Sequence, residues 1–261
     1  MGVACVEPGC ARRVQAHGPV QVEENPERRS AIEGFAVYLA SLPRSAEFLR
    51  LAGDSALQGR LRGGEVVAVP ARSLTTLPDT TAAGSEIQHW IGAAFVSGVT
   101  LSQAIPVLAD YSNRRKYMAP EIAASRELER RENDFFVYLQ MSEKSIISGT
   151  FDTYLRIRYR REGPGRLSID SRSEEIRDVT GADPHDRGLL WALNHRWRIQ
   201  EADGGLYLEC EALALSRRPP AVIDFLASRF IAQAARKALV GTLEATRRML
   251  QAETALALTS R

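Results

Sequence analysis

The sequence has few cysteines and no long apolar run, and each shortage excludes a class of protein. Its 261 residues include only three cysteines, at positions 5, 10 and 210, which are too few for a disulfide framework. The longest nearly apolar run, residues 91–99, is interrupted by glycine and is much shorter than the roughly 20 residues of a membrane-spanning helix. The first thirty residues lack the apolar core of a signal peptide. We therefore expect a cytoplasmic protein with no integral membrane segment.

Lysine is also scarce, and the charge pattern gives no sign of a nucleic-acid partner. Only three of the 34 basic residues are lysines, the arginines are spread over the whole length, and the formal net charge is +2. Proteins that bind nucleic acids typically have a clustered basic face. The dispersed arginines do not predict such a face, so we expect no nucleic-acid partner. With 44% hydrophobic and 25% charged residues, the composition is that of a globular protein with a substantial core.

The residues that bind metals or activate substrates elsewhere do not form a recognisable motif here. Cys5 and Cys10 precede His17, but a zinc site needs a fourth ligand and none is close. His185 lies within the segment Asp183–Asp186, which has no spacing that would bring ligands together. The sequence has no glycine-rich phosphate loop, no nucleophile elbow and no paired-histidine motif. We expect no metal and no cofactor.

The most informative segment is 189–215, which the alternation of its residues predicts to be one β-hairpin. Asp203-Gly204 is a preferred pair for a type I′ turn, because both central residues need positive φ. A two-residue loop there fixes the register of the two strands. On one face this register pairs Ile199 with Leu208, Trp197 with Cys210, His195 with Ala212 and Leu193 with Ala214. On the other face, Arg198 pairs with Glu209 and Arg196 with Glu211.

The charged residues of these strands are expected to lie in solvent. The Arg196–Glu211 and Arg198–Glu209 pairs are then cross-strand ion pairs worth less than about 1 kcal/mol each. Further charges, Asp152, Asp170, Arg172 and Glu174, belong to the middle strands, and their alternation favours a solvated charge ladder over an acid–base pair.

The order of elements predicts an α+β fold. The boundaries that we expect are a disordered leader over 1–29, a helical extension and linker over 30–84, a main domain over 85–252 and a tail over 253–261. In the extension, Ser30 and Glu33 form a capping box for a helix that ends at Pro43, and a second helical stretch covers 45–61. Short strands are expected over 65–69 and 86–96.

The main domain continues with a short helix and a run of six strands. Thr100 and Gln103 form a capping box, and Pro106 is expected to kink that helix or divide it into two pieces. From Glu121 to Leu215 the period is two, which predicts six antiparallel strands. A long helix follows, from Ala221 to about Ala252. Its expected inner stripe is Ile223, Leu226, Phe230, Ala234, Ala238, Gly241, Ala245 and Met249. A curved antiparallel sheet that grips this helix buries that stripe.

Several segments resemble the START-like, or helix-grip, superfamily, which includes polyketide cyclase/dehydrase-type and coenzyme-Q-binding START proteins. The residues that carry the resemblance are Leu108-Ala109-Asp110-Tyr111, the run from Tyr117 to Arg126, Trp197-Arg198-Ile199, and Asp203-Gly204-Gly205 before the long helix. The resemblance covers about residues 86–250. It implies a cavity between sheet and helix, in proteins that mostly bind lipids, sterols, quinones or aromatic polyketides.

Three functions follow from this resemblance. The first is binding, with or without transport, of a hydrophobic or aromatic small molecule such as a lipid or quinone. The second is a cyclase/hydratase-type enzyme acting on an aromatic or polyketide-like substrate. The third is a protein-interaction module with a filled cavity. The superfamily has no universal catalytic motif, so no catalytic residue carries over, and fold alone does not fix activity.

His195 is the polar residue of most interest, because alternation places it on the same face as Trp191 and Trp197. It either orients a ligand or acts as an acid or base near neutral pH, or it is a core histidine with a protein partner. Tyr111, Tyr117 and Met118 are expected either near the cavity mouth or as a staple of the helix to the sheet. The expected cavity wall consists of His195, Trp191, Trp197, Phe151, Leu155, Leu193, Phe230, Leu226 and Tyr117.

Overall fold

The computed structural model describes residues 26–42, 47–74, 84–143, 149–180, 188–218 and 224–259. The helices are α1 (Pro26–Ser41), α2 (Ser55–Arg62), the short 3₁₀ helix η1 (Ala71–Ser73), α3 (Leu101–Leu108), α4 (Arg114–Met118) and α5 (Asp224–Thr259). The strands are β1 (Val67–Pro70), β2 (Ser85–Ser97), β3 (Ile122–Arg131), β4 (Asp134–Glu143), β5 (Gly149–Arg161), β6 (Arg166–Asp178), β7 (Leu190–Ala202) and β8 (Gly205–Arg217).

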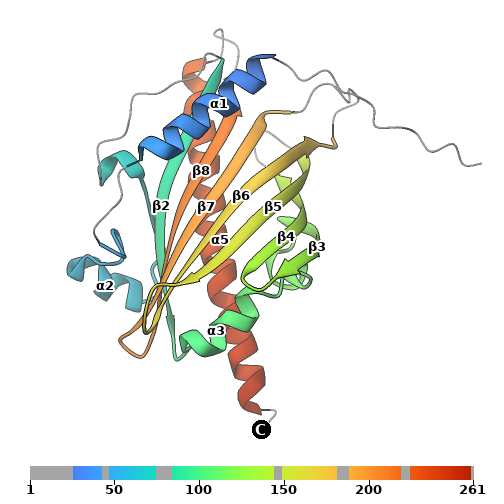
Figure 1. The fold of residues 1–261 in the computed structure, drawn as a ribbon. Coiled ribbons are helices and arrows are strands. Elements are labelled where there is room, and N and C mark those ends of the chain that lie inside the picture. The colour runs from blue at the N-terminus through green and yellow to red at the C-terminus, as the bar shows by residue number, and fades with distance from the viewer. Residues whose placement is uncertain are drawn as a thin grey trace, which may run out of the picture.

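Within these ranges the strands form one curved antiparallel sheet with helices on both faces (Figure 1). The strand order is β1-β2-β8-β7-β6-β5-β4-β3, so β2 pairs with the last strand rather than with β3. Helix α5 crosses one face of the sheet, which we call the inner face, and α1 lies on the opposite, outer face (Figure 1). The α+β prediction is confirmed, and so is the run of six antiparallel strands, β3 to β8.

The β7–β8 hairpin has the register that the turn predicted. His195 pairs with Ala212 and Trp197 with Cys210, and all of the other predicted pairs are also present. Asp203 and Gly204 have φ angles of 53° and 73°, as a type I′ turn requires. The local sequence was sufficient here, because a two-residue turn leaves only one register that buries one face of both strands.

Helix α5 packs closely against Gly92 of β2. A Cβ atom at this position would lie 2.7 Å from Leu243 Cδ1 and 3.1 Å from Leu239 Cδ2. The buried stripe of α5 therefore runs through Leu239, Leu243 and Leu250. This differs from the predicted stripe, in which Phe230 is 44% exposed. Ala238 and Gly241 are also exposed, whereas Ala245 and Met249 are buried as expected.

The N-terminal extension covers the outer face of β2 and β8. One cluster joins Phe35 and Tyr38 of α1 to Leu213 and Leu215 of β8. A second joins the segment 49–61 to the outward residues Ile91, Ala93 and Phe95 of β2 and Tyr207 of β8. The extension thus completes the hydrophobic core on the side of the sheet that α5 does not reach.

Several predicted boundaries are wrong by a few residues or more. Helix α1 starts at Pro26, so Ser30 lies inside it instead of capping it, and residues 26–29 are not part of a leader. Only Ser55–Arg62 of the second stretch is helical. Helix α5 runs to Thr259, which places the expected tail largely within a helix. The Thr100–Gln103 capping box is confirmed, and the helix that contains Pro106 ends at Leu108, before the separate α4.

Cys5, Cys10, His17 and His185, the candidate metal ligands in the sequence, lie outside the described residues. Within the described ranges, His, Cys, Asp and Glu side chains nowhere gather in a group able to hold a metal ion. None of the helices described is both long enough and apolar enough to cross a membrane.

Candidate ligand-binding site

The inner face of the sheet consists of two halves that differ in packing. Near the β7–β8 turn it is a solid core, in which Leu206, Leu208 and Ile199 are fully buried. Further along the same strands the inner side chains keep accessible surface. The half-buried members are Leu193, His195 and Trp197 of β7, Ala212 and Ala214 of β8, and Trp90 of β2. We call this set the open wall.

His195 is the polar side chain at the centre of the open wall. Its strand position pairs it with Ala212 on one side and Ser171 on the other. Desolvation by burial lowers the pKa of its imidazole from 6.5 to about 4, so the ring is neutral at pH 7. The ring has no hydrogen-bond partner among the residues that the structure describes. A neutral imidazole has one N–H donor and one acceptor nitrogen to offer.

Other predicted wall residues belong to the inner face but differ in exposure. Trp197 packs against the core cluster while remaining partly accessible. Leu155 is 6% exposed and belongs to that cluster. Phe151 is also 6% exposed and lies across from Met141 of β4. The wall is therefore continuous from β7 to β5, with its β5 members more deeply packed.

Trp191 lies on the other face of the sheet. A β-bulge between Leu190 and Ala192 breaks the alternation, so that Trp191 packs with Phe35 and Tyr38 of α1 in the outer cluster. Its indole Nε1 donates to the carbonyl of Gly188 at 3.2 Å. A strict alternation from His195 placed it on the inner face, and the bulge is the reason for the difference.

The two predicted wall residues of α5 do not extend the wall. Phe230 is 44% exposed. The side chain of Leu226 lies outside the described residues.

Tyr117 of α4 has a buried hydroxyl without a hydrogen-bond partner in the described part of the chain. Its ring packs against the core cluster, and Lys116 Nζ lies 4.7 Å from the ring centroid. Tyr111 differs, because its hydroxyl is 2.7 Å from that of Tyr159, which donates to the carbonyl of Leu108 at 2.7 Å. Tyr111 therefore staples the end of α3 to the sheet.

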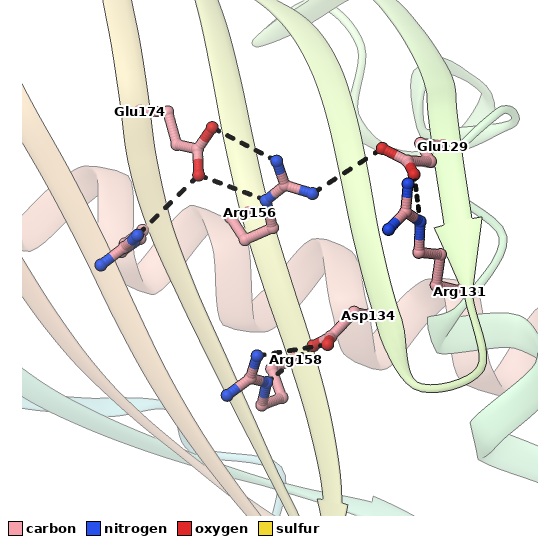
Figure 2. A pocket seen from close by; sticks show the side chains of 7 residues that line it. Glu129, Arg131, Asp134, Arg156, Arg158 and Glu174 are labelled. Atoms are coloured by element: carbon pink, nitrogen blue, oxygen red, sulfur yellow. Dashed lines mark hydrogen bonds and ion pairs between the residues drawn. The ribbon is translucent and has the colours of Figure 1, made fainter.

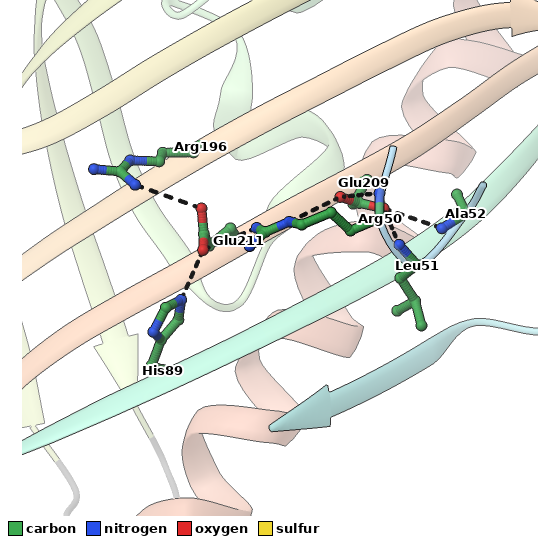
Figure 3. A network of polar contacts seen from close by, with 7 residues as sticks. All are labelled: Arg50, Leu51, Ala52, His89, Arg196, Glu209 and Glu211. Atoms are coloured by element: carbon green, nitrogen blue, oxygen red, sulfur yellow. Dashed lines mark hydrogen bonds and ion pairs between the residues drawn. The ribbon is translucent and has the colours of Figure 1, made fainter. Parts of the chain in front are cut away.

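The outer face of β8 contains a buried polar network that the sequence did not predict (Figure 3). Glu209 is 2% exposed and accepts hydrogen bonds from the backbone N–H groups of Arg50, Leu51 and Ala52 at 3.1, 2.7 and 3.0 Å. The expected exposed pair with Arg198 is therefore wrong. The carboxylate instead binds the backbone of residues 50–52, the segment that covers it.

Glu211 is buried beside it and has three charged or polar partners (Figure 3). Arg50 Nη2 and His89 Nε2 each lie 2.8 Å from its Oε1 atom, and Arg196 is at 3.7 Å. Burial alone raises the pKa of Glu211, but the His89 hydrogen bond and the Arg50 charge outweigh it and lower the pKa to about 2. Tyr38 of α1 lies 2.8 Å from His89 Nδ1, and burial followed by the Glu211 charge raises the pKa of Tyr38 to about 12.

The outer face of β3 to β6 carries the exposed charge ladder that was predicted. Arg158 pairs with Asp134 at 2.7 Å and Arg156 with Glu174 at 3.2 Å. These side chains border a surface recess of about 300 Å³ on the side of the sheet away from α5 (Figure 2). Its lining is Glu129, Arg131, Asp134, Arg156, Arg158, Arg172 and Glu174.

The curved antiparallel sheet and the long helix across its inner face form the helix-grip arrangement that the sequence predicted. A STAR-related lipid transfer protein from Xanthomonas axonopodis is 17% identical over 66% of this chain and 96% of its own, with a TM-score of 0.47. The Zhui aromatase/cyclase from Streptomyces sp. R1128 is 15% identical over 64% and 94%, with a TM-score of 0.49. The lipid transfer and protein localization domain of human StarD13 is 10% identical over 76% and 97%, with a TM-score of 0.43.

No family model matches the chain, and no curated protein matches it in sequence.

Proposed function

We propose that this protein binds a hydrophobic small molecule between the open wall and the N-terminal half of α5. The observation that carries the proposal is that His195 is both strongly desolvated and accessible, with no partner among the described residues. These properties occur together in a side chain that lines a recess. The neighbours that share its face, Trp197, Leu193 and Ala212, are apolar and also half-buried.

The side of α5 that borders this space is lined by small residues. Met249, near the C-terminal end, contacts Arg114 of α4 at 3.2 Å. Three helical turns earlier the same side carries Ala238, which is exposed. The described elements thus leave Ala238 uncovered, and we propose that an apolar molecule on the open wall contacts this side of α5.

The energetics suit an apolar ligand with one polar group. Burial against the open wall stabilises the complex by about 25 cal/mol per Å² of apolar surface. One hydrogen bond to neutral His195 then orients the ligand, because few polar groups set specificity in such sites. The helix-grip resemblance makes lipids and quinones the first ligands to test.

The pKa of His195 favours binding over acid–base catalysis. A general base works best when its pKa is near the working pH. At about 4, the imidazole is a weak base at neutral pH. The described residues also place no second polar group in hydrogen-bond contact with it. A completely filled interior is disfavoured at β7 and β8, because the inward side chains Leu193, His195 and Ala214 keep accessible surface there.

The test uses two neighbouring residues of β7 that point to opposite faces. Leu193 lies on the open wall, and Asn194 pairs with Arg172 on the outer face. The purified protein is examined by native mass spectrometry with organic extraction, and then titrated with a fluorescent fatty-acid probe and a fluorescent quinone probe. Leu193→Trp is expected to weaken probe binding at least about tenfold, or about 1.4 kcal/mol, whereas Asn194→Trp leaves it unchanged. Empty protein that takes up neither probe, or equal loss in both variants, contradicts the proposal.

A further inference from the structure

The outer face of the sheet is only half covered. The N-terminal extension packs on β2 and β8 and, in the described residues, reaches β6 only at its two ends, where Arg28 of α1 donates to the carbonyl of Ile176 and Phe48 lies under Arg166. None of the described helices lies over the middle of β4, β5 and β6 (Figure 1). We use the name arginine face for the outward side chains of β4, β5 and β6 together with Arg196 and Arg198 of β7. By register this face carries eight arginines and five carboxylates.

The guanidinium groups are the outermost charges of this face. Arg172 is 70% exposed against 34% for Glu174, and Arg158 is 59% exposed against 38% for Asp134. The labelled arginines and carboxylates rise from the strands on the side away from α5 (Figure 2). A partner that approaches this face therefore meets positive charge first.

Two arginines of this face have donors that no carboxylate takes up. Arg172 lies directly opposite Arg156 across the β5–β6 pair, and its contact with Glu174 is long, at 3.9 Å. Arg198 pairs in register with Glu209, whose carboxylate is occupied by the backbone of residues 50–52. In the described part of the chain Arg198 makes no ion pair. The buried network thus removes the acid that balances this arginine.

Aromatic rings lie among these charges. Phe136 and Tyr154 stack with ring centroids 6.2 Å apart, and the Arg156 guanidinium lies 4.7 Å above Phe136. Arginine and aromatic side chains are the residues enriched at protein–protein interfaces and at their energetic hot spots. Three strands about 4.8 Å apart, with an additional row from β7, span about 20 Å by about 30 Å. That projected area, on the order of 600 Å², approaches the roughly 800 Å² that one partner of a standard interface buries.

We propose that the arginine face binds a protein partner that presents acidic side chains. Carboxylates fit the free donors of Arg172 and Arg198, and bidentate guanidinium–carboxylate pairs give such contacts their geometry. The five carboxylates of this face disfavour a polyphosphate chain or an anionic membrane, because those surfaces require a field of one sign. A partner on this face leaves the inner face free, so the interaction is independent of the ligand proposed above.

The test is a binding measurement with a defined probe. A labelled 20-residue peptide in which Glu alternates with Tyr is titrated with the full chain, and binding is followed by fluorescence anisotropy at two salt concentrations. The Arg172→Gln/Arg198→Gln double variant is expected to bind it at least about fivefold more weakly, because each substitution removes a charge-assisted hydrogen-bond donor. The control is Arg62→Gln/Arg248→Gln, whose side chains are 49% and 64% exposed and lie outside this face.

The proposal predicts that the control binds like the unmodified protein and that both double variants keep its melting temperature. Arg172, Arg62 and Arg248 are exposed, and the half-buried Arg198 makes no ion pair with the described residues, so their substitution changes stability little. It is overturned if the peptide does not bind, or if both double variants lose the same affinity. It is also overturned if phosphatidylserine vesicles or a single-stranded oligonucleotide bind to this face more tightly than the peptide does.

Discussion

His195 shows how one residue's surroundings set its chemistry. On an exposed strand it would titrate near 6.5, but on the open wall desolvation lowers its pKa to about 4. The folded protein therefore disfavours the charged imidazole. At neutral pH the ring is a hydrogen-bonding group without charge, which suits an apolar ligand with one polar atom.

This pKa shift predicts a stability loss in mild acid. Above pH 6.5 the imidazole is neutral in both folded and unfolded chains and has no effect. As the pH falls from 6.5 toward 4, the unfolded chain gains a proton that the folded protein resists, so stability falls by at most about 3 kcal/mol. Urea unfolding at pH 7.5 and pH 4.5 measures this, with His195→Phe as reference. The variant should lose less stability on acidification; an identical loss in both proteins contradicts the shift.

Glu211 offers a second prediction at the residue scale. Glu211→Gln removes the charge that Arg50 and His89 face in a buried site, and breaking one partner of a buried pair costs about 3–5 kcal/mol. Glu174→Gln on the exposed ladder should cost less than about 1 kcal/mol. Urea unfolding at pH 7 compares them. Similar small losses would show that the network adds little to stability.

The stability contribution of Glu211 is lost on acidification in a lower pH range than the loss caused by His195. Its pKa is lowered from 4.5 to about 2, so its contribution is complete above pH 4.5 and is lost as the pH falls toward 2. The sequence placed Glu209 and Glu211 on the correct face of β8 but in solvent. Their burial depends on residues 50–52, about 160 positions away, and no local pattern reports such a contact.

At the scale of elements, strand β8 serves two sites at once. Its inward residues Cys210 and Ala212 alternate with its outward residues Glu209 and Glu211. The period of two predicted this division, and the Asp203-Gly204 turn predicted the register. Trp191 broke the same rule, because a bulge rotates it to the other face. A bulge leaves no clear mark in a sequence that otherwise alternates.

Helix α5 was predicted as an element but not in its orientation. Its apolar and small residues occupy more than one stripe, and period alone did not decide which of them faces the sheet. The structure shows that Gly92 decides it, because a glycine on β2 admits Leu239 and Leu243. Gly92 and the leucines of α5 are far apart in the sequence, so this contact can be recognised only in the tertiary structure.

A substitution at Gly92 tests this packing. Gly92→Val places carbon atoms where Leu243 Cδ1 and Leu239 Cδ2 now lie, and overpacking of this kind costs about 1–3 kcal/mol. Gly59→Ala is the control, because nothing lies within 4 Å of its Cβ position in α2. Alanine is the better helix former there, so a neutral or slightly stabilising effect is expected. Melting temperatures separate the two variants, and an unaffected Gly92→Val would contradict close helix–sheet contact.

At the scale of the whole molecule, each face of the sheet has two parts with different surroundings. The inner face is half solid core and half open wall, and the outer face is half covered by the N-terminal extension and half arginine face. A single row of alternating charges crosses the outer face in register, from Asp134 through Arg158, Asp170 and Arg196 to Glu211. The row starts in solvent and ends in the buried network.

The sequence predicted this molecule best where contacts are local. The strands, the hairpins and the resemblance to the helix-grip fold follow from alternation, turn residues and short motifs. The extension was predicted to be helical, but not to cover β2 and β8 and bury two carboxylates. Such coverage depends on how distant surfaces fit, which a one-dimensional pattern does not contain.

The central claim is that an apolar ligand lies against the open wall, and tryptophan quenching tests it most directly. Trp197 is on the inner face, whereas Trp191 is in the outer cluster with α1. Two single-tryptophan proteins are prepared, one with Trp197 alone (Trp90→Phe/Trp191→Phe) and one with Trp191 alone (Trp90→Phe/Trp197→Phe). Each is titrated with a brominated fatty acid, which quenches on contact. Saturable quenching of Trp197 but not of Trp191 is the predicted result; quenching of Trp191 alone, or of neither, would contradict the claim.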